Sequence, residues 1–344
     1  MKTILLSVNF FLIIVQGAQV GEEKRKTPFL ILLQAGLFFH LERFDSTSIL
    51  GELITIFDLP ILLSLSFSPS KTMRLWELIR IFSTNFIGDL LEFDTIRLQL
   101  DQDVYLRLLS QPENPDYNVI IFRGGCSYFG NKIGYYSKIL CALSSNIRFF
   151  QFEKMAPAVN FNMTDDIDKV ITYVKKNYSG KIILVGFSMG GIVIMSYLAS
   201  GKDNADGYLT VCSPINLKYF VEQVNSNYIY KNVQQQTCID YGAENVDDLY
   251  LKANTNRKEI ESYIENFGEK LSAIKIFEKV GCIIGAEDLL TLTFENDANE
   301  LNLPVTILKI SGATHCCISC VHRAHKVLEK MKMNISMHEA VIAD

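Results

Sequence analysis

The residues best suited to carry out a reaction surround Ser188. They lie in a segment that runs from Gly186 to Gly190 and fits the pattern G-x-S-x-G. A short, wholly apolar run, Ile182 to Val185, precedes this segment, and a helical stretch from Met189 to Ser200 follows it. A strand, a tight turn and a helix with a serine at the apex form a nucleophile elbow. Such a turn strains the serine backbone, so a side chain at Gly186 or Gly190 is expected to collide with the neighbouring helix or strand.

The same pentapeptide also arises by chance, and the serine then belongs to an ordinary helix N-terminus. The apolar strand before it and the long helix after it favour the elbow. A serine hydroxyl is a poor nucleophile until a base removes its proton and an acid orients that base. The elbow therefore predicts a histidine and a carboxylate elsewhere in the chain, each following a strand.

The chain supplies both groups downstream of the serine. A buried strand that begins near Val280 ends in two acids, Glu287 and Asp288. Of the five histidines, only His315 follows a strand, residues 305–310, and a small glycine loop. We predict Asp288 as the acid and His315 as the base. Glu287 is the competing acid, because one residue of register decides which carboxylate faces the histidine.

The tetrahedral intermediate of such a reaction needs backbone N–H donors for its oxyanion. One predicted donor is Met189, directly after the nucleophile at the start of the helix. The second is expected in the loop after the strand that ends at Phe122, where Gly124 and Gly125 let the backbone approach the substrate. Gly125 is the preferred donor, with Cys126 as the next candidate.

The elements around these residues follow a regular order. Apolar alternation predicts an antiparallel hairpin over residues 93–109, and Thr164 is expected as the N-cap of an amphipathic helix. Strands that alternate with helices imply a mostly parallel sheet with right-handed crossovers. The alternation stops between Pro214 and Ile274, so we predict a helical cap at about residues 215–275, above the carboxyl ends of the strands where ligands bind. A helical excursion without function is the alternative.

A hairpin leading into a parallel sheet with an elbow at its middle resembles the α/β-hydrolase superfamily, over residues 92–330. This resemblance implies a mostly parallel central sheet flanked by helices, and the chain order serine, acid, histidine. The segment 185–191 and Ser213-Pro214 are similar to a branch of membrane-associated esterases and lipases, the alpha/beta hydrolase domain-containing 1 and 3 type. Members of that branch act on carboxylic esters, including lipid esters, and several carry an N-terminal membrane anchor. This chain departs from them in the oxyanion loop, where Arg123-Gly124 replaces the common His-Gly.

A second cluster, from His315 to His325, contains residue types that bind metals. Cys317 and Cys320 have CxxC spacing, and His322 and His325 follow closely. These residues fall on one expected helix, whose single face presents at most two or three ligands. Small buried thiols that pack the last helix against the sheet are the preferred interpretation, and no metal or cofactor is expected.

The N-terminal part of the chain differs from the rest. Residues 1–20 have a basic start, an apolar run and small residues after it, which resembles a secretory signal peptide or a signal anchor. A buried N-terminal strand or helix is the alternative. Residues 21–91 form an apolar extension, and residues 331–344 a C-terminal tail. We therefore expect membrane association or the secretory pathway, with a cytoplasmic location as the alternative.

Composition limits the classes of partner. The chain has 344 residues, of which 49% are hydrophobic, so it can bury a large core. The net charge is −5 and neither sign forms a long run, which argues against nucleic acid as a partner.

Together these features predict a serine hydrolase that cleaves a small-molecule or lipid carboxylic ester through an acyl-enzyme. One alternative keeps Ser188, Asp288 and His315 but changes the bond to a thioester, amide or peptide. Another alternative, from a different class, is a non-catalytic α/β-hydrolase that serves in binding.

Overall fold

The catalytic candidates lie on an eight-stranded sheet. The computed structural model describes residues 94–124, 133–144, 146–154, 163–226, 244, 257–272, 274, 279–303, 305–332 and 336–342. The predicted signal or anchor segment 1–20, the extension 21–91 and much of the predicted cap lie outside these residues. None of the described helices combines the length and the apolar character needed to cross a bilayer.

The strands run in the order β1-β2-β4-β3-β5-β6-β7-β8 across the sheet. β1 and β2 form the expected antiparallel hairpin, β2 pairs antiparallel with β4, and all other neighbours are parallel. The predicted mostly parallel sheet is therefore confirmed. The strands are β1 Ile96–Gln99, β2 Val104–Leu108, β3 Tyr117–Phe122, β4 Ile147–Lys154, β5 Lys181–Phe187, β6 Gly207–Val211, β7 Val280–Gly285 and β8 Thr306–Ile310.

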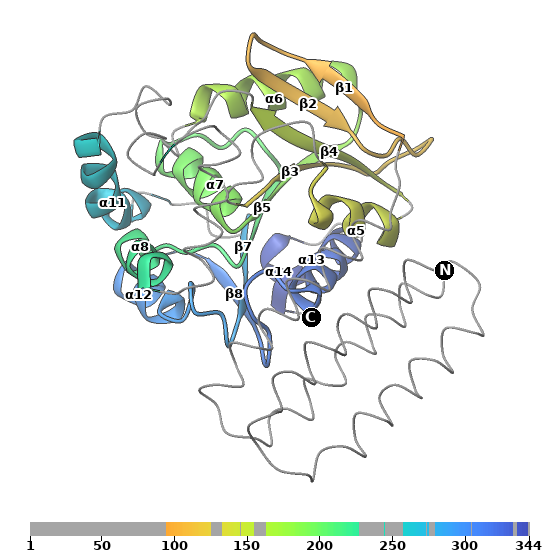
Figure 1. Cartoon of the computed structure of the whole chain (residues 1–344). Helices are drawn as coiled ribbons and strands as arrows, with labels where there is room; N and C mark the ends of the chain where they lie inside the picture. The colour runs from red at the N-terminus through yellow and green to blue at the C-terminus, as the bar shows by residue number, and fades with distance from the viewer. Residues whose placement is uncertain are drawn as a thin grey trace. The chain divides into compact units, whose positions relative to one another are not determined.

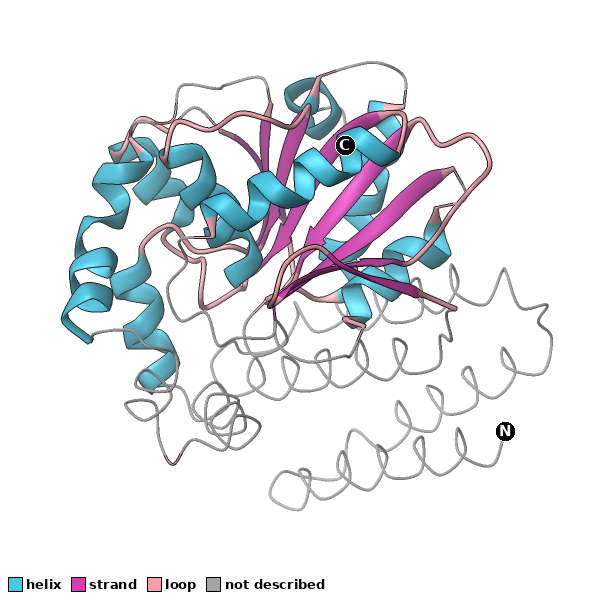
Figure 2. Ribbon diagram, turned by 90° about the horizontal axis from the view of Figure 1, so that it is seen from above, coloured by secondary structure: helices cyan, strands magenta, loops and turns pink. Residues whose placement is uncertain are grey.

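Helices cover both faces of the sheet (Figures 1 and 2). α5, α13 and α14 pack together on one face, while α6 and α7 pack on the other, where α11 lies against α7 and α8. The helices are α5 Tyr135–Leu143, α6 Thr164–Asn177, α7 Met189–Ala199, α8 Leu217–Ser226, α11 Arg257–Leu271, α12 Phe294–Glu300, α13 Ile318–Met331 and α14 Met337–Ile342.

The sequence patterns account for these positions. β3 is buried along its whole length and β5 is buried from its second residue, because both have helices on each face and a near-continuous apolar run. α7 is apolar nearly all round, since the sheet covers one side and α6 and α11 cover the other.

One expectation is wrong: Met163 holds the N-cap position of α6, and Thr164 is already its first helical residue. The backbone of Met163 leaves the helix, and its carbonyl accepts the first helical hydrogen bond from Ile167 N–H at 2.9 Å.

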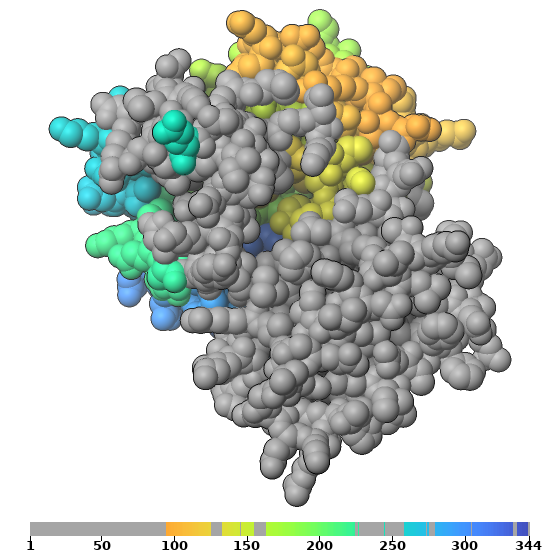
Figure 3. All heavy atoms as spheres, viewed as in Figure 1, coloured from red at the N-terminus to blue at the C-terminus, as the bar shows by residue number. Residues whose placement is uncertain are grey.

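A buried charge cluster joins the hairpin to the sheet. The β1–β2 segment is coloured orange in Figure 3. Glu153 of β4 is fully buried and lies opposite Tyr105 of β2 in the sheet. Its carboxylate accepts hydrogen bonds from Arg107 Nε at 2.6 Å, Arg97 Nε at 2.9 Å and Gln151 Nε2 at 3.0 Å. The carboxylate thus pairs with Arg107, whose side chain is only 11% exposed, and with the more exposed Arg97.

Replacing Glu153 with alanine is expected to lower the free energy of unfolding by about 3 kcal/mol, because Arg107 would remain buried without its counter-charge. Urea denaturation measures this change. Glu295→Ala is the matched control, since Glu295 pairs with Lys309 at a position where both side chains are more than two-fifths exposed; a change within about 0.5 kcal/mol is expected there. Equal effects of the two substitutions would contradict a structural role for the buried cluster.

Candidate active site

Ser188 lies at the junction of β5 and α7 in a strained conformation, with φ 51° and ψ −118°. A positive φ is costly for a residue with a side chain, and here it turns the hydroxyl out of the sheet. The Ser188 N–H donates to the carbonyl of Val211, at the end of β6, at 2.8 Å, which fixes the turn against the neighbouring strand. The strained backbone that the sequence predicted is confirmed.

The two outer glycines of the pattern are required by close backbone approach. A Cβ on Gly186 would lie 2.5 Å from the carbonyl group of Gly190, in the first turn of α7. A Cβ on Gly190 would lie 2.1 Å from the carbonyl oxygen of Phe122, at the end of β3. Both predicted collisions are confirmed, and each involves main-chain atoms that cannot move aside as a flexible side chain would.

Gly190→Ala is therefore expected to lower the free energy of unfolding by at least about 3 kcal/mol, because the β3 carbonyl must shift to admit the methyl group. The measurement is urea denaturation followed by circular dichroism. Gly201→Ala provides the comparison: its φ is +79°, but a Cβ there meets nothing within 4 Å. That substitution should cost only about 1–2 kcal/mol from backbone strain. A smaller loss for Gly190→Ala than for Gly201→Ala would contradict the close packing at the elbow.

A histidine bridges the serine and a carboxylate. His315 Nε2 lies 2.8 Å from Ser188 Oγ, and His315 Nδ1 lies 2.9 Å from Asp288 Oδ2. Ser188 is 7% exposed, Asp288 is fully buried, and the imidazole is 13% exposed. The structure thus brings together the three residues that the sequence singled out as nucleophile, acid and base.

The turn after β7 selects Asp288 over Glu287. The Glu287 N–H donates to the carbonyl of Ala313 at 2.9 Å, and the Asp288 N–H donates to that of Gly285 at 3.2 Å. This geometry directs the Asp288 carboxylate to the histidine, while its other oxygen accepts the Leu290 N–H at 3.0 Å. Glu287 is half-buried and forms no part of this pair.

Two opposing effects act on the pKa of the Asp288 carboxyl. Burial raises the pKa of the Asp288 carboxyl above its ordinary value, and the charge and hydrogen bond of His315 oppose that rise. A buried carboxyl whose pKa is shifted by burial and by a specific charged partner is typical of candidate functional sites.

The loop after β3 approaches the serine closely. A Cβ on Gly124 would lie 2.7 Å from Ser188 Cβ, so only glycine allows this contact without displacement. Met189 is the first residue of α7, which puts its N–H in the first turn of the helix beside Ser188. The other predicted oxyanion donors, Gly125 and Cys126, lie outside the described residues. Arg123 is buried, and its Cδ would lie 2.7 Å from a Cβ on Gly134.

One supporting residue was missed from the sequence. The ring of Tyr136, on α5, stacks on Phe187 with centroids 4.5 Å apart and planes 4° from parallel. Phe187 directly precedes Ser188, so this stack supports the turn at Ser188 from the face of the sheet that carries α5. A tyrosine in an expected helix carries no signal for such long-range packing.

Two helices from the predicted cap region pack near these residues. Phe220 of α8 packs on Leu290, two residues after Asp288. Tyr263 of α11 forms a hydrogen bond with Ser196 of α7, the helix that begins beside the nucleophile. α8 thus contacts the loop that carries Asp288, and α11 is hydrogen-bonded to α7.

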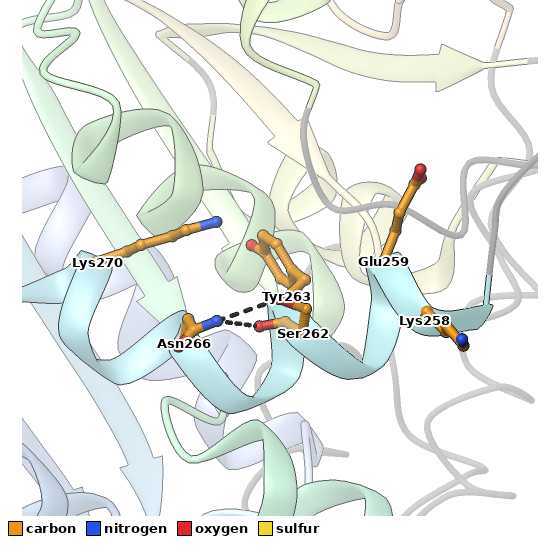
Figure 4. Close-up of a pocket in the computed structure, with 6 residues that line it drawn as sticks. All are labelled: Lys258, Glu259, Ser262, Tyr263, Asn266 and Lys270. Carbon is orange, nitrogen blue, oxygen red and sulfur yellow. Dashed lines mark hydrogen bonds between the residues drawn. The ribbon is translucent and has the colours of Figure 1, made fainter.

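A hollow of about 370 Å³ lies along the exposed face of α11 (Figure 4). Lys270 Nζ lies 4.8 Å from the centroid of the Tyr263 ring, and Asn266 Nδ2 donates to the carbonyl oxygen of Ser262 at 2.8 Å. The hollow is open to solvent and contains none of the residues that contact His315. The lining residues are Lys258, Glu259, Ser262, Tyr263, Asn266 and Lys270.

Within the described part of the chain, no group of three or more histidine, cysteine and acidic side chains is arranged to hold a metal ion. His322 and His325 lie on α13, as expected. His325 Nδ1 lies 2.8 Å from Ser144 Oγ, in a contact between α13 and the end of α5.

Comparison with known proteins supports the architecture. No protein-family model matches the sequence, and no curated protein matches it. An esterase of Pyrobaculum calidifontis, in a monoclinic crystal form, matches the structure with a TM-score of 0.51 at 14% identity, over 78% of this chain and 95% of that one. A structure described as a hyperthermophilic esterase from the same archaeon matches with a TM-score of 0.50 at 12% identity, over 80% of this chain and 98% of that one. The chain has the α/β-hydrolase fold.

Proposed function

We propose that this protein is a serine hydrolase that cleaves carboxylic esters. The observation that carries the proposal is the pair of hydrogen bonds made by His315, to Ser188 at 2.8 Å and to Asp288 at 2.9 Å. The proposal agrees with the fold, because two solved structures that share it are described as esterases. An imidazole held by a buried carboxylate and facing a hydroxyl has the geometry needed to activate that hydroxyl.

The reaction follows from these contacts. As Ser188 Oγ attacks the carbonyl carbon, His315 Nε2 takes the hydroxyl proton, and the charge on the imidazolium is balanced by Asp288. The carbonyl oxygen becomes an oxyanion, for which Met189 N–H and Gly125 N–H are the proposed donors. Collapse of the intermediate breaks the bond to the alcohol, which receives the proton from the histidine. A water molecule then repeats the sequence on the acyl-enzyme and releases the acid.

We infer that the substrate is lipophilic. Leu290, two residues after Asp288, packs on Phe220, and Leu292 is 47% exposed, so apolar side chains follow the acid directly in the chain. The similarity to membrane-associated esterases and lipases and the apolar residues 1–91 support the same inference. In this proposal α8 and α11 belong to a cap over the site, and the N-terminal segment brings the protein to a membrane surface.

A series of p-nitrophenyl esters of increasing acyl length, assayed on the full chain with and without detergent micelles, tests this proposal. We expect kcat/KM to rise from acetate toward medium and long acyl groups, and micelles to increase the rate for the longer ones. A preference for acetate without any effect of micelles would exclude a lipophilic substrate. Hydrolysis of none of the esters would contradict the proposed reaction.

A further inference from the structure

Four cysteines gather beside His315 and have no part in the proposed reaction. All four are at most 2% exposed, and they come from two separate parts of the chain. Cys212 follows β6, whereas the others lie in the turn after His315 and at the start of α13. The four are Cys212, Cys316, Cys317 and Cys320.

Cys320 is the sulfur at the centre of this thiol cluster. Its Sγ lies 3.5 Å from Cys212 Sγ and 3.8 Å from Cys317 Sγ. Cys316 Sγ lies 3.7 Å from the carbonyl oxygen of Val211, the same oxygen that accepts the Ser188 N–H. The cluster is therefore linked to the elbow by one backbone carbonyl and to the histidine by one peptide bond.

The backbone around the cluster is strained. Cys212 has φ 50° and Cys316 has φ 47°, both in the left-handed region that non-glycine residues rarely adopt. Cys317 is the N-cap of the 14-residue helix α13, so Cys320 lies in its first turn. The hydrogen bonds with Cys212 and Cys317, together with burial, raise the pKa of the Cys320 thiol above its ordinary value. Burial raises the pKa of the Cys212 thiol, but the thiols of Cys316 and Cys320 together with His315 lower it by more.

We propose that Cys212 and Cys320 form an oxidisable dithiol whose disulfide disables the neighbouring histidine, with a hydroperoxide as the oxidant. The Cys212 thiolate attacks one peroxide oxygen, the O–O bond breaks, and the alcohol leaves with a proton, which gives a sulfenic acid. Cys320 sulfur then attacks that sulfur, the S–S bond forms, and water leaves. Two thiols and one hydroperoxide thus give one disulfide, one alcohol and one water.

Distance and position favour this pair over the CxxC pair. Cys212 is the sulfur nearer to Cys320, and a disulfide between them would tie the end of β6 to α13 across the site. An S–S bond is about 2.05 Å long, so the two sulfurs must approach by roughly 1.5 Å. The strained turns beside Ser188 and His315 would take up that movement. A displacement of about 1 Å at reacting groups costs on the order of 100-fold in rate.

The test treats the full chain with tert-butyl hydroperoxide, blocks free thiols by alkylation and maps the disulfides by mass spectrometry. A Cys212–Cys320 disulfide is expected in the native protein and absent in Cys320→Ala, while Cys141→Ala, which removes a buried thiol of α5, should leave it unchanged. Absence of this disulfide, or a Cys317–Cys320 disulfide in its place, would overturn the pairing. This readout does not depend on the proposed hydrolase function.

Activity is the second readout, and it does rest on the proposed function. Hydrolysis of a p-nitrophenyl ester should fall at least about tenfold as the disulfide forms and should return on reduction with dithiothreitol. Cys320→Ala should keep its activity through the same treatment. Full activity with the disulfide present would contradict the proposal that the disulfide disables His315. A disulfide in a protein without any esterase activity would contradict the proposed function alone.

Discussion

Ser188→Ala is expected to lower kcat for ester hydrolysis by about 10⁶-fold, with little change in KM. Without the hydroxyl no acyl-enzyme forms, and the hydrogen bond between Ser188 Oγ and His315 Nε2, 2.8 Å long in the native chain, is lost. The backbone need not change, because alanine differs from serine only by the missing hydroxyl oxygen and meets the same backbone strain at this turn. The free energy of unfolding should therefore stay close to that of the native chain.

Ser196→Ala is the matched control for this loss. Ser196 lies on α7, the helix that begins directly after Ser188, and its hydroxyl donates to the carbonyl of Ile192 at 2.8 Å. Its removal deletes a half-buried hydroxyl of α7 but no group that contacts Ser188 or His315 in the structure, so kcat should remain close to the native value. Comparable losses in the two variants would show that the loss does not depend on the Ser188 hydroxyl in particular, and the assignment of Ser188 would be wrong.

Asp288→Asn is expected to lower kcat by about 10⁴-fold. The asparagine oxygen would accept the Leu290 N–H, as Asp288 Oδ1 does at 3.0 Å, so its NH₂ group would face His315. The imidazole would then hold its proton on Nε2 and could not accept the proton of Ser188. Steady-state kinetics with a p-nitrophenyl ester measure this loss, and Glu287→Gln should leave kcat nearly unchanged. Equal losses in both variants would contradict the assignment of the acid.

The same substitution carries a prediction about stability. Because burial raises the pKa of Asp288 above 3.8, the folded state binds more protons than the unfolded state between the two pKa values. The stability contributed by this group therefore falls as the pH rises through that interval, and stays low above it. Asp288→Asn removes the charge, so at neutral pH its free energy of unfolding should equal or exceed that of the native chain. A large loss of stability at neutral pH would show that the carboxylate serves mainly to hold the fold.

Local signals explain why so much of the site could be predicted. The glycines of the elbow, the apolar strand before them and the helix after them are all contained within one short segment, and the structure shows the clashes that require the glycines. The hairpin and the alternating strands follow from periodicity, which fixes which face of each element is buried. Both kinds of signal can be read without knowing the tertiary structure.

Features that depend on tertiary contacts could not be predicted. The sequence favours Asp288 as the acid but leaves Glu287 as a competitor, because no pattern records the turn that hydrogen-bonds Asp288 N–H to the carbonyl of Gly285. The stack of Tyr136 on Phe187 joins α5 to the elbow across the sheet. The sequence grouped Cys320 with its CxxC neighbour, whereas its nearest sulfur comes from Cys212, more than a hundred residues earlier.

Reaction of the native full chain with a fluorophosphonate tests the central claim most directly, because this reagent phosphonylates a serine only when a base has activated it. We expect one covalent adduct, mapped to Ser188, and loss of that adduct in both Ser188→Ala and His315→Ala. An unlabelled native protein, or a label that persists in Ser188→Ala, would contradict the account.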